Sequence, residues 1–361
     1  MGETRMRALQ VTRHGEPEDV LEVRDVEEPE PGPREVRIRV AAAALNHNDL
    51  ARCRGTLASV VKDPPFTIGM DLCGVVDAAG AGAEAWLGRR VVAVATDALG
   101  GIAEATTAPI DGVFDAPEQL DDIEAAAFLL PFHTTHLALF GRGALVAGET
   151  LVVTGAASGL GTAAVQLGRS AGARVIAAVG APEAGGHDKV ARCRQLGADD
   201  VVVLADPDDP GTPVDLADAV LDLTDEWGAD VVCDLVGGGL VAPAWRCTAR
   251  GGRYLAVGFT DDDQNGMTGR PVRMASIGNF SIVGVLGAWV DDLDPGMRRF
   301  GFNPFPRAEG EVVHDRLRAL VADGQIRPHV GRVVAMDDAG AALADHGNRR
   351  TVGRTVVRVT E

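Results

Sequence analysis

The stretch that decides the fold is Leu151-Val-Val-Thr-Gly-Ala-Ala-Ser-Gly-Leu-Gly161, which continues into Thr162-Ala-Ala-Val-Gln-Leu-Gly168. The apolar residues before the first glycine predict a buried strand, and the amphipathic run after the turn predicts a helix. A tight turn in this position aims backbone N–H groups and the helix N-terminus at a phosphate. Glycines at this spacing, between a strand and a helix, indicate a dinucleotide site.

We expect this turn to hold the pyrophosphate through six consecutive residues. They are Ala156, Ala157, Ser158, Gly159, Leu160 and Gly161. The small residue at Gly161 allows the helix to approach the strand closely. The alternative is a tight turn in a sheet that binds nothing, but the small residues and the surrounding strand–helix pattern agree on a dinucleotide site.

Strands and helices alternate on both sides of this turn. The segment 122–140 reads as one helix, and 160–172, 188–197 and 215–228 read as further helices. Apolar strands are predicted at 174–180, 199–204, 229–237, 251–259 and 280–289. Six strands separated by amphipathic helices predict a doubly wound parallel sheet of the Rossmann type.

The first 125 residues have a different sequence pattern. Short segments in which apolar and polar residues alternate are separated by Gly and Pro. This pattern predicts a small, mostly antiparallel β-domain. The tail contains two short helices and two short strands and is too short to be a domain, so we expect it to complete the β-domain. The expected division is therefore 1–125 with 292–361 for the β-domain, and 126–291 for the dinucleotide-binding domain.

The second strand of the α/β region bears on the choice of dinucleotide. An NAD site places an acid at the end of this strand to bind the ribose hydroxyls. Here the strand ends at Gly180, and the cation Lys189 follows shortly after. A missing carboxylate and a nearby cation favour the 2′-phosphate of NADPH. Two alternatives stay open: Lys189 belongs to an ordinary solvated helix face, or Glu183 fills the role of the acid.

Composition narrows the possible partners. With 34 Lys+Arg against 52 Asp+Glu, the formal net charge is −18. Such a surface repels phosphate backbones and anionic lipid, so we expect neither nucleic acid nor membrane as a partner. The five cysteines are scattered, and the charged N-terminus does not resemble a signal peptide. These features predict a cytoplasmic protein.

The ordered motifs resemble the zinc-independent branch of the medium-chain dehydrogenase/reductase superfamily, the quinone oxidoreductase-like enzymes. The similar segments are Asn46-His-Asn-Asp49, Pro65-Phe-Thr-Ile-Gly-Met-Asp-Leu-Cys-Gly-Val-Val76, Gly88-Arg-Arg-Val91, Val153 to Gly161, Asp234-Leu-Val-Gly-Gly238, Asp323-Gly-Gln-Ile-Arg-Pro328 and Gly353-Arg-Thr-Val-Val357. Each is weak alone, but together they cover nearly the whole chain. The resemblance implies a GroES-like β-domain beside the Rossmann-type domain, and a homodimer.

The resemblance also predicts that the site contains no metal. Zinc-dependent members of the superfamily place Cys where this chain has Asn46, and His-Glu where it has Met70-Asp71. Methionine is a poor zinc ligand. Without a metal, the hydride acceptor must delocalise its own negative charge, as a quinone or an α,β-unsaturated carbonyl compound does. The expected activity is therefore NADPH-dependent reduction of a small quinone or enone.

The resemblance also assigns candidate residues around the nicotinamide. Asn46 is expected beside the substrate carbonyl as a hydrogen-bond donor, while Asp49 anchors its loop or transfers a proton. His47 and His133 are candidate proton donors, each with a packing role as the alternative. Further cofactor contacts are expected from Thr135, Val236, Gly237, Gly258, Phe259 and Arg354.

Three alternatives also have a basis in the sequence. The turn also resembles the short-chain dehydrogenase loop, but that family pairs Tyr with Lys four residues on, and the only tyrosine, Tyr254, has Gly258 there. A non-catalytic NADPH-binding sensor or scaffold is one alternative function. A reductase of carrier-bound or CoA-linked enoyl substrates is another, which the acidic balance disfavours.

Overall fold

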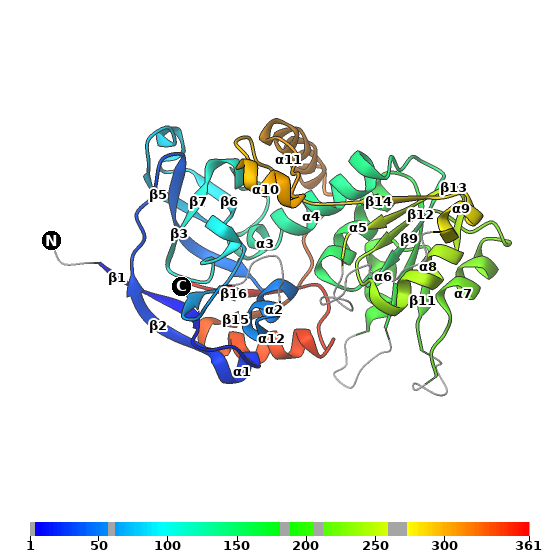
Figure 1. Cartoon of the computed structure of the whole chain (residues 1–361), viewed down its shortest axis with the longest axis horizontal. Helices are drawn as coiled ribbons and strands as arrows, with labels where there is room; N and C mark the ends of the chain where they lie inside the picture. Colours follow the sequence, from blue (N-terminus) through cyan, green and yellow to red (C-terminus); the bar gives the residue numbers. More distant parts are fainter. Residues whose placement is uncertain (1–3, 57–61, 181–187, 206–211, 259–272, 361) are drawn as a thin grey trace. The chain divides into compact units, whose positions relative to one another are not determined.

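The computed structural model describes residues 4–56, 62–180, 188–205, 212–258 and 273–360. The chain divides into two compact units, Met1–His133 with Ala288–Glu361, and Thr134–Gly287. We call them the β-rich unit and the α/β unit (Figure 1). The expected divisions, after residues 125 and 291, lie eight and four residues from the observed ones. No helix of the described residues is both long enough and apolar enough to cross a lipid bilayer.

The β-rich unit contains two sheets. One has the order β2-β1-β4, and the other has the order β15-β16-β3-β5-β6-β8 with β7 also paired to β3. Among the described strands of this unit, β15 and β16 pair in parallel and the other pairs are antiparallel. The strands are β1 (Arg5–Val11), β2 (Leu21–Glu27), β3 (Glu35–Ala44), β4 (Phe66–Thr67), β5 (Asp71–Ala79), β6 (Arg90–Val94), β7 (Ala105–Pro109), β8 (Val113–Asp115), β15 (Val330–Ala335) and β16 (Arg354–Arg358).

Helices pack around these sheets. They are α1 (Pro17–Val20), α2 (His47–Arg54), α3 (Asp122–Ala126), α10 (Pro295–Phe300), α11 (Arg307–Ala322) and α12 (Ala339–Gly347). The C-terminal strand β16 pairs with β3, so the tail of the chain returns to the sheet formed by its beginning. Alternating apolar residues of these strands form a core that includes Ile38, Leu72 and Val91.

The α/β unit contains one parallel sheet of six strands in the order β11-β10-β9-β12-β13-β14. This order, with the first strand in the middle, confirms the expected Rossmann-type fold. The strands are β9 (Thr150–Thr154), β10 (Arg174–Val179), β11 (Asp200–Val203), β12 (Ala229–Asp234), β13 (Thr248–Ala256) and β14 (Ser281–Gly284). The helices are α5 (Gly159–Ser170), α6 (Lys189–Leu196), α7 (Leu216–Leu223), α8 (Val241–Arg246) and α9 (Arg273–Gly278).

Two elements differ from the sequence prediction. The expected helix over 122–140 is broken into α3, α4 (Leu129–His136) and a π-helical turn over Leu137–Arg142. Pro131 falls in the first turn of α4, where the helix needs no N–H donor, so the proline favours a new helix start there. The last strand, expected to extend to residue 289, ends at Gly284. Short 3₁₀ helices are found at Glu84–Trp86, Thr96–Ala98, Ile110–Gly112, Gly238–Leu240 and Met336–Asp338.

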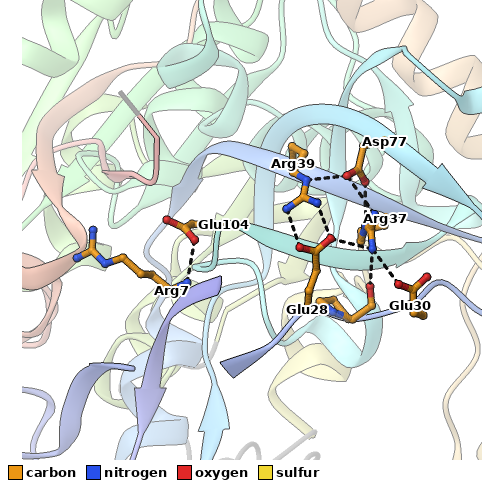
Figure 2. Close-up of polar contacts among 8 residues, drawn as sticks. Arg7, Glu28, Glu30, Arg37, Arg39, Asp77 and Glu104 are labelled. Atoms are coloured by element: carbon orange, nitrogen blue, oxygen red, sulfur yellow. Dashed lines mark hydrogen bonds and ion pairs between the residues drawn. The ribbon is translucent and has the colours of Figure 1, made fainter. Parts of the chain in front are cut away.

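An ion-pair network covers part of the β-rich unit (Figure 2). Arg37 and Arg39 alternate along β3 and therefore point to the same face of the sheet. Both bind Asp77 on β5, and both bind Glu28, which follows β2. Arg37 also binds Glu30, 3.1 Å away. The shared acids give each arginine more than one partner.

Candidate cofactor site and buried polar clusters

The turn after β9 has the geometry expected of a phosphate loop. Gly155 has a φ of +60°, which favours glycine. Ser158 caps α5, and its Oγ accepts the N–H of Gly161 at 3.1 Å. A Cβ on Gly161 would lie 2.2 Å from the carbonyl oxygen of Gly155, so only glycine lets the helix start this close to the strand. The turn and the helix start are thus fixed by backbone geometry.

The N–H groups of this loop divide into used and unused donors. Ala156 and Ser158 donate to backbone carbonyls, and Gly161 donates to Ser158. Within the described part of the chain, the remaining N–H groups have no acceptor; they belong to Ala157, Gly159 and Leu160. Three unused donors at the positive end of a twelve-residue helix are what an anionic pyrophosphate requires. The loop therefore fits a dinucleotide.

None of the described residues at the end of β10 carries a carboxylate. Gly180 follows β10 and is exposed. Lys189 is the first residue of α6, and Asp188 caps that helix by accepting the N–H of Ala191 at 2.8 Å. Lys189 is buried to 9% exposure, so it is not part of a freely solvated face. Glu183, the alternative acid, lies outside the described residues.

Two further turns at the same edge of the sheet carry candidate cofactor contacts. The N–H groups of Val236 and Gly237 both bond to Oδ1 of Asp234, at 3.0 and 3.1 Å. The N–H of Gly258 bonds to the carbonyl oxygen of Asp234 at 3.0 Å. Phe259 lies outside the described residues. The turns after β12 and β13 are therefore both attached to one residue that the sequence reasoning did not single out.

Thr135 lies in α4 and its side chain is fully buried. Thr134, one position earlier, retains 8% of its surface. The role of Thr135 beside the nicotinamide stays a prediction.

In the β-rich unit, Asn46 sits at the start of α2 within a buried cluster. Its Nδ2 donates to Oδ1 of Asp71 at 2.8 Å and to the carbonyl of Ala44 at 3.1 Å. Its Oδ1 accepts from Nη1 of Arg354 at 2.7 Å. Nη2 of Arg354 lies 2.9 and 2.7 Å from the two oxygens of Asp71. All three of these side chains are at most 5% exposed.

This cluster corrects two expectations. Both N–H bonds of the Asn46 amide are occupied, so Asn46 does not have a free donor for a substrate carbonyl. Both terminal nitrogens of Arg354 are committed to Asp71 and Asn46, so the arginine is paired inside the protein instead of being open to a pyrophosphate. Sequence reasoning missed Asp71 as their shared partner, although it stands in the quoted Gly-Met-Asp segment.

Asp49 anchors the start of α2. Its Oδ2 accepts the N–H of Asn46 at 2.9 Å and its Oδ1 accepts the N–H of Gly69 at 3.1 Å. Burial raises the pKa of Asp49 above its usual value, while Arg52, whose Nη1 is 3.7 Å from the carboxylate, opposes this. Burial also lowers the pKa of Arg52. With both oxygens used by backbone donors, Asp49 is built as an anchor for its loop.

His47, the first residue of α2, faces a second histidine. Its ring centroid is 6.4 Å from that of His346 in α12. Burial, together with the nearby His47 and Arg354, lowers the pKa of His346 to about 4. Asn48, the next residue of α2, donates from Nδ2 to the sulfur of Met70 at 3.4 Å. Because sulfur is a weak acceptor, Asn48 can exchange this contact for a stronger one at little cost.

His133 belongs to a hydrogen-bonded chain inside the β-rich unit. Nε1 of Trp289 donates to Nδ1 of His133 at 3.1 Å, and Nε2 of His133 lies 3.0 Å from Nδ1 of His314. Nε2 of His314 contacts the carbonyl oxygen of Asp115 at 2.9 Å. An indole can only donate and a carbonyl can only accept, so the direction of every bond is fixed and both imidazoles are neutral. Burial lowers the pKa of His314 to about 4.

This arrangement argues against His133 as a proton donor to substrate. The side chain is 2% exposed, and its one N–H is directed at His314. The other ring nitrogen receives the indole N–H of Trp289, so an added proton would displace that bond. Trp289 is buried and takes part in the same chain.

All five cysteines are buried and free. Burial raises the pKa of Cys53, Cys73, Cys193 and Cys247 to about 12, and that of Cys233 also rises. Thiols of this kind are inert. Over the described ranges, no group of three or more His, Cys, Asp or Glu side chains has the arrangement of a metal site.

Two family models match the chain. The alcohol dehydrogenase GroES-like domain matches residues 32–118, and the zinc-binding dehydrogenase model matches residues 159–300. A quinone oxidoreductase of Pseudomonas aeruginosa is 30% identical over 351 residues, covering 97% of this chain and 99% of its own length. The chain therefore belongs to the medium-chain dehydrogenase/reductase superfamily, and within it to the quinone oxidoreductase-like family. It is a pyridine-nucleotide-dependent oxidoreductase.

Solved structures have the same architecture over the whole chain. A mycobacterial protein complexed with NADPH has a TM-score of 0.80 at 26% identity, covering 98% of this chain and 99% of its own. An NAD-dependent alcohol dehydrogenase has a TM-score of 0.79 at 29% identity, covering 98% and 100%. The first is a complex with NADPH, whereas the second is NAD-dependent.

Proposed function

We propose that this protein reduces small quinones or α,β-unsaturated carbonyl compounds with NADPH and without a metal ion. The observation that carries the proposal is the Asn46–Asp71–Arg354 cluster. Asn46 stands where zinc-dependent members of the superfamily are expected to have Cys, and Asp71 belongs to the Met70-Asp71 pair that replaces their His-Glu. An amide and an arginine-paired carboxylate are poor donors for zinc, so the reaction must suit an acceptor that spreads its own charge.

The phosphate loop supports binding of a dinucleotide. The unused N–H groups of Ala157, Gly159 and Leu160 would hold the pyrophosphate. Gly180 leaves room for a 2′-phosphate, and Lys189 would supply the positive charge for it. When bound, NADPH supplies a hydride from its nicotinamide ring.

The chain's own residues would then act mainly by placement and hydrogen bonding. Asp49 fixes the start of α2 through backbone bonds to Asn46 and Gly69. This places Asn48 and His47 in the first turn of α2 as candidate donors to a carbonyl oxygen. Asn48 donates without titrating, whereas His47 is the residue of this turn that could move a proton.

We also propose a homodimer that pairs the β14 strands of two copies. Among the described strands β14 has only β13 as a neighbour, and its outer edge is open. Leu286, just beyond β14, and Ile277 in α9 are 42% and 73% exposed. A second copy would cover both the strand edge and these apolar side chains. Sedimentation analysis tests this: Leu286→Arg should shift the dimer toward monomer, and Val312→Arg, an exposed residue of α11, should not.

The activity is tested by following NADPH oxidation with 1,4-naphthoquinone, a linear enone and a simple ketone. We expect turnover with the first two, little with the ketone, and no loss after dialysis against a zinc chelator. Metal analysis of the same sample should find less than stoichiometric zinc. Turnover that disappears on chelation and returns with zinc would overturn the metal-free proposal.

Cofactor choice and the sensor alternative have separate tests. Lys189→Met keeps the apolar stem but removes the charge, and should raise KM for NADPH about tenfold while leaving that for NADH unchanged. Arg194→Met, exposed in the last turn of the same helix, is the matched control. Tight NADPH binding with no turnover on any acceptor would favour the non-catalytic sensor or scaffold instead.

A further inference from the structure

The strand order of the parallel sheet reverses between β9 and β12. From β9 the chain moves to β10 and β11, whereas β12 leads to β13 and β14 on the opposite side. Ligands of such sheets bind at the carboxyl ends of the two strands that flank this reversal. The two residues that end these strands are Thr154 and Asp234.

Thr154 and Asp234 are bonded to each other and to the turns that follow. Oγ1 of Thr154 donates to Oδ1 of Asp234 at 2.6 Å and accepts the N–H of Leu235 at 3.0 Å. The same Oδ1 accepts the N–H groups of Val236 and Gly237. The hydroxyl of Tyr254, on β13, donates to Oδ2 at 2.5 Å.

The backbone of Asp234 extends the same network to a third turn. Its carbonyl oxygen accepts the N–H groups of Val257 and Gly258, at 3.1 and 3.0 Å. A Cβ on Gly258 would lie 2.1 Å from the carbonyl oxygen of Leu235, so the turns after β12 and β13 are in close contact. One residue thus fixes the end of β9 and both of these turns.

The way Asp234 is buried indicates a role beyond holding the sheet. Its side chain has no exposed surface, and the ion pairs found among the described residues do not include it. Its partners are two hydroxyls and two backbone N–H groups, all neutral. Burying a carboxylate without a cation is costly, and two neighbouring strands are already held by their ladder of backbone bonds. A carboxylate is suited to this place because it accepts four bonds from donors on three segments.

We propose that Asp234 is a positioning residue for the nicotinamide half of the bound dinucleotide. The proposal rests on the dinucleotide binding proposed above. Asp234 sets the backbone at Val236, Gly237 and Gly258. None of its hydrogen bonds goes to residues 156–161, the loop that would hold the pyrophosphate. Its loss should therefore weaken the nicotinamide half of the site and spare the adenosine half.

Asp230 offers a matched control on the same strand. It lies at the opposite end of β12, where its Oδ2 accepts the N–H of Thr150, the first residue of β9, at 2.8 Å. Asp230 and Asp234 therefore both connect β12 to β9 through a carboxylate, at opposite ends of β12. A purely structural role predicts that either change affects both halves of the dinucleotide equally, whereas the proposal predicts that the Asp234 change affects the nicotinamide half alone.

The test compares binding of NADPH with binding of 2′,5′-ADP, which represents the adenosine half alone, by titration calorimetry on the full chain. For Asp234→Asn we expect about tenfold weaker NADPH binding, with 2′,5′-ADP within about twofold of wild type. For Asp230→Asn we expect both within about twofold. Tyr254→Phe removes a single bond from Oδ2 and should weaken NADPH binding about threefold, which keeps the proposal testable if Asp234→Asn does not fold.

Equal weakening of both ligands in the Asp234 variant, or no change in either, would overturn the proposal. A Tyr254→Phe protein that binds both ligands as wild type does would count against it as well. If wild type itself binds neither ligand, the proposed NADPH function fails first, and the two failures are therefore distinguished by the wild-type titration.

Discussion

Asp71 and Asp234 are both fully buried carboxylates, one in each unit, but they are neutralised in different ways. The guanidinium group of Arg354 donates hydrogen bonds to both carboxylate oxygens of Asp71. Asp234 receives only neutral hydroxyl and N–H donors, four in all. The negative charge of Asp71 is therefore compensated by one cation. That of Asp234 is compensated by several neutral hydrogen-bond donors arranged around it.

The two clusters should lose different amounts of stability when one partner is removed. Removing the single cation from Asp71 leaves most of the charge uncompensated, so the loss should be large and concentrated in one residue. Removing one neutral donor from Asp234 leaves three others, so each loss should be smaller.

The largest effect is expected for Arg354→Met. It strands the Asp71 carboxylate in the core and should lower the free energy of unfolding by about 3–5 kcal/mol, measured by urea denaturation. Arg332→Met is the control, because its pair with Asp345 on the surface is 45% and 36% exposed and should contribute less than about 1 kcal/mol. A loss no larger than that of the control would show that the buried pair is not what holds α2 to β16.

The histidine chain should produce the next largest effect, through pH. The pKa of His314 is about 4 in the folded protein against 6.5 for an ordinary histidine, because burial disfavours the charged ring. As the pH falls below 6.5 the unfolded chain takes up this proton first, so stability is lost progressively down to about pH 4. The full loss from this one group is about 3 kcal/mol.

The measurement is the free energy of unfolding between pH 7.5 and 4.5 for wild type and His314→Asn. The variant should lose less stability over this range, since it lacks the buried group that must be charged. His14→Asn, on the exposed surface, is the control and should follow wild type. Parallel curves for all three proteins would contradict the neutral, fixed-direction chain of Trp289, His133 and His314.

Tyr254→Phe tests the cluster around Asp234. It removes one of four donors from Asp234, and the unfolding free energy should fall by about 1–3 kcal/mol. Combining it with Asp234→Asn should cost less than the sum of the two single changes, because the stranded charge is absent in the double variant. Strict additivity in this cycle would mean that the phenol and the carboxylate do not interact.

The smallest effect is expected at the ion-pair network of Figure 2. Arg39→Ala should cost less than about 1 kcal/mol and should cost nearly nothing in concentrated salt. Its side chain is 44% exposed, and Arg37 still binds Glu28 and Asp77. Arg37→Ala should cost more, because that side chain is 14% exposed and has three acidic partners. The reverse order would contradict the role of burial.

Much of the fold follows from local sequence patterns. The glycines after β9, the β-branched strands and the capping residues Asp188 and Ser158 act over a few residues, so their effect can be read directly from the chain. The family resemblance supplied the GroES-like unit and the class of reaction. The break in the helix around Pro131 was missed because its period is helical on both sides of the break.

The polar clusters could not be derived in this way, since their members are far apart in the sequence. Arg354 is 283 residues from Asp71, and His133 is 181 residues from His314. Asp234 and Tyr254 are 20 residues apart, but the bond between them depends on β12 and β13 being neighbours. Motif matching singled out Asn46 and Arg354 but could not reveal that they bind each other.

The single tyrosine of the chain, Tyr254, gives the α/β unit a built-in reporter. Replacing tyrosine biosynthetically with a fluorinated analogue introduces one ¹⁹F nucleus, attached to the ring whose hydroxyl binds Asp234. Its NMR signal needs no assignment, because there is only one. Addition of a complete dinucleotide should displace this resonance, whereas a fragment lacking the nicotinamide should leave it in place.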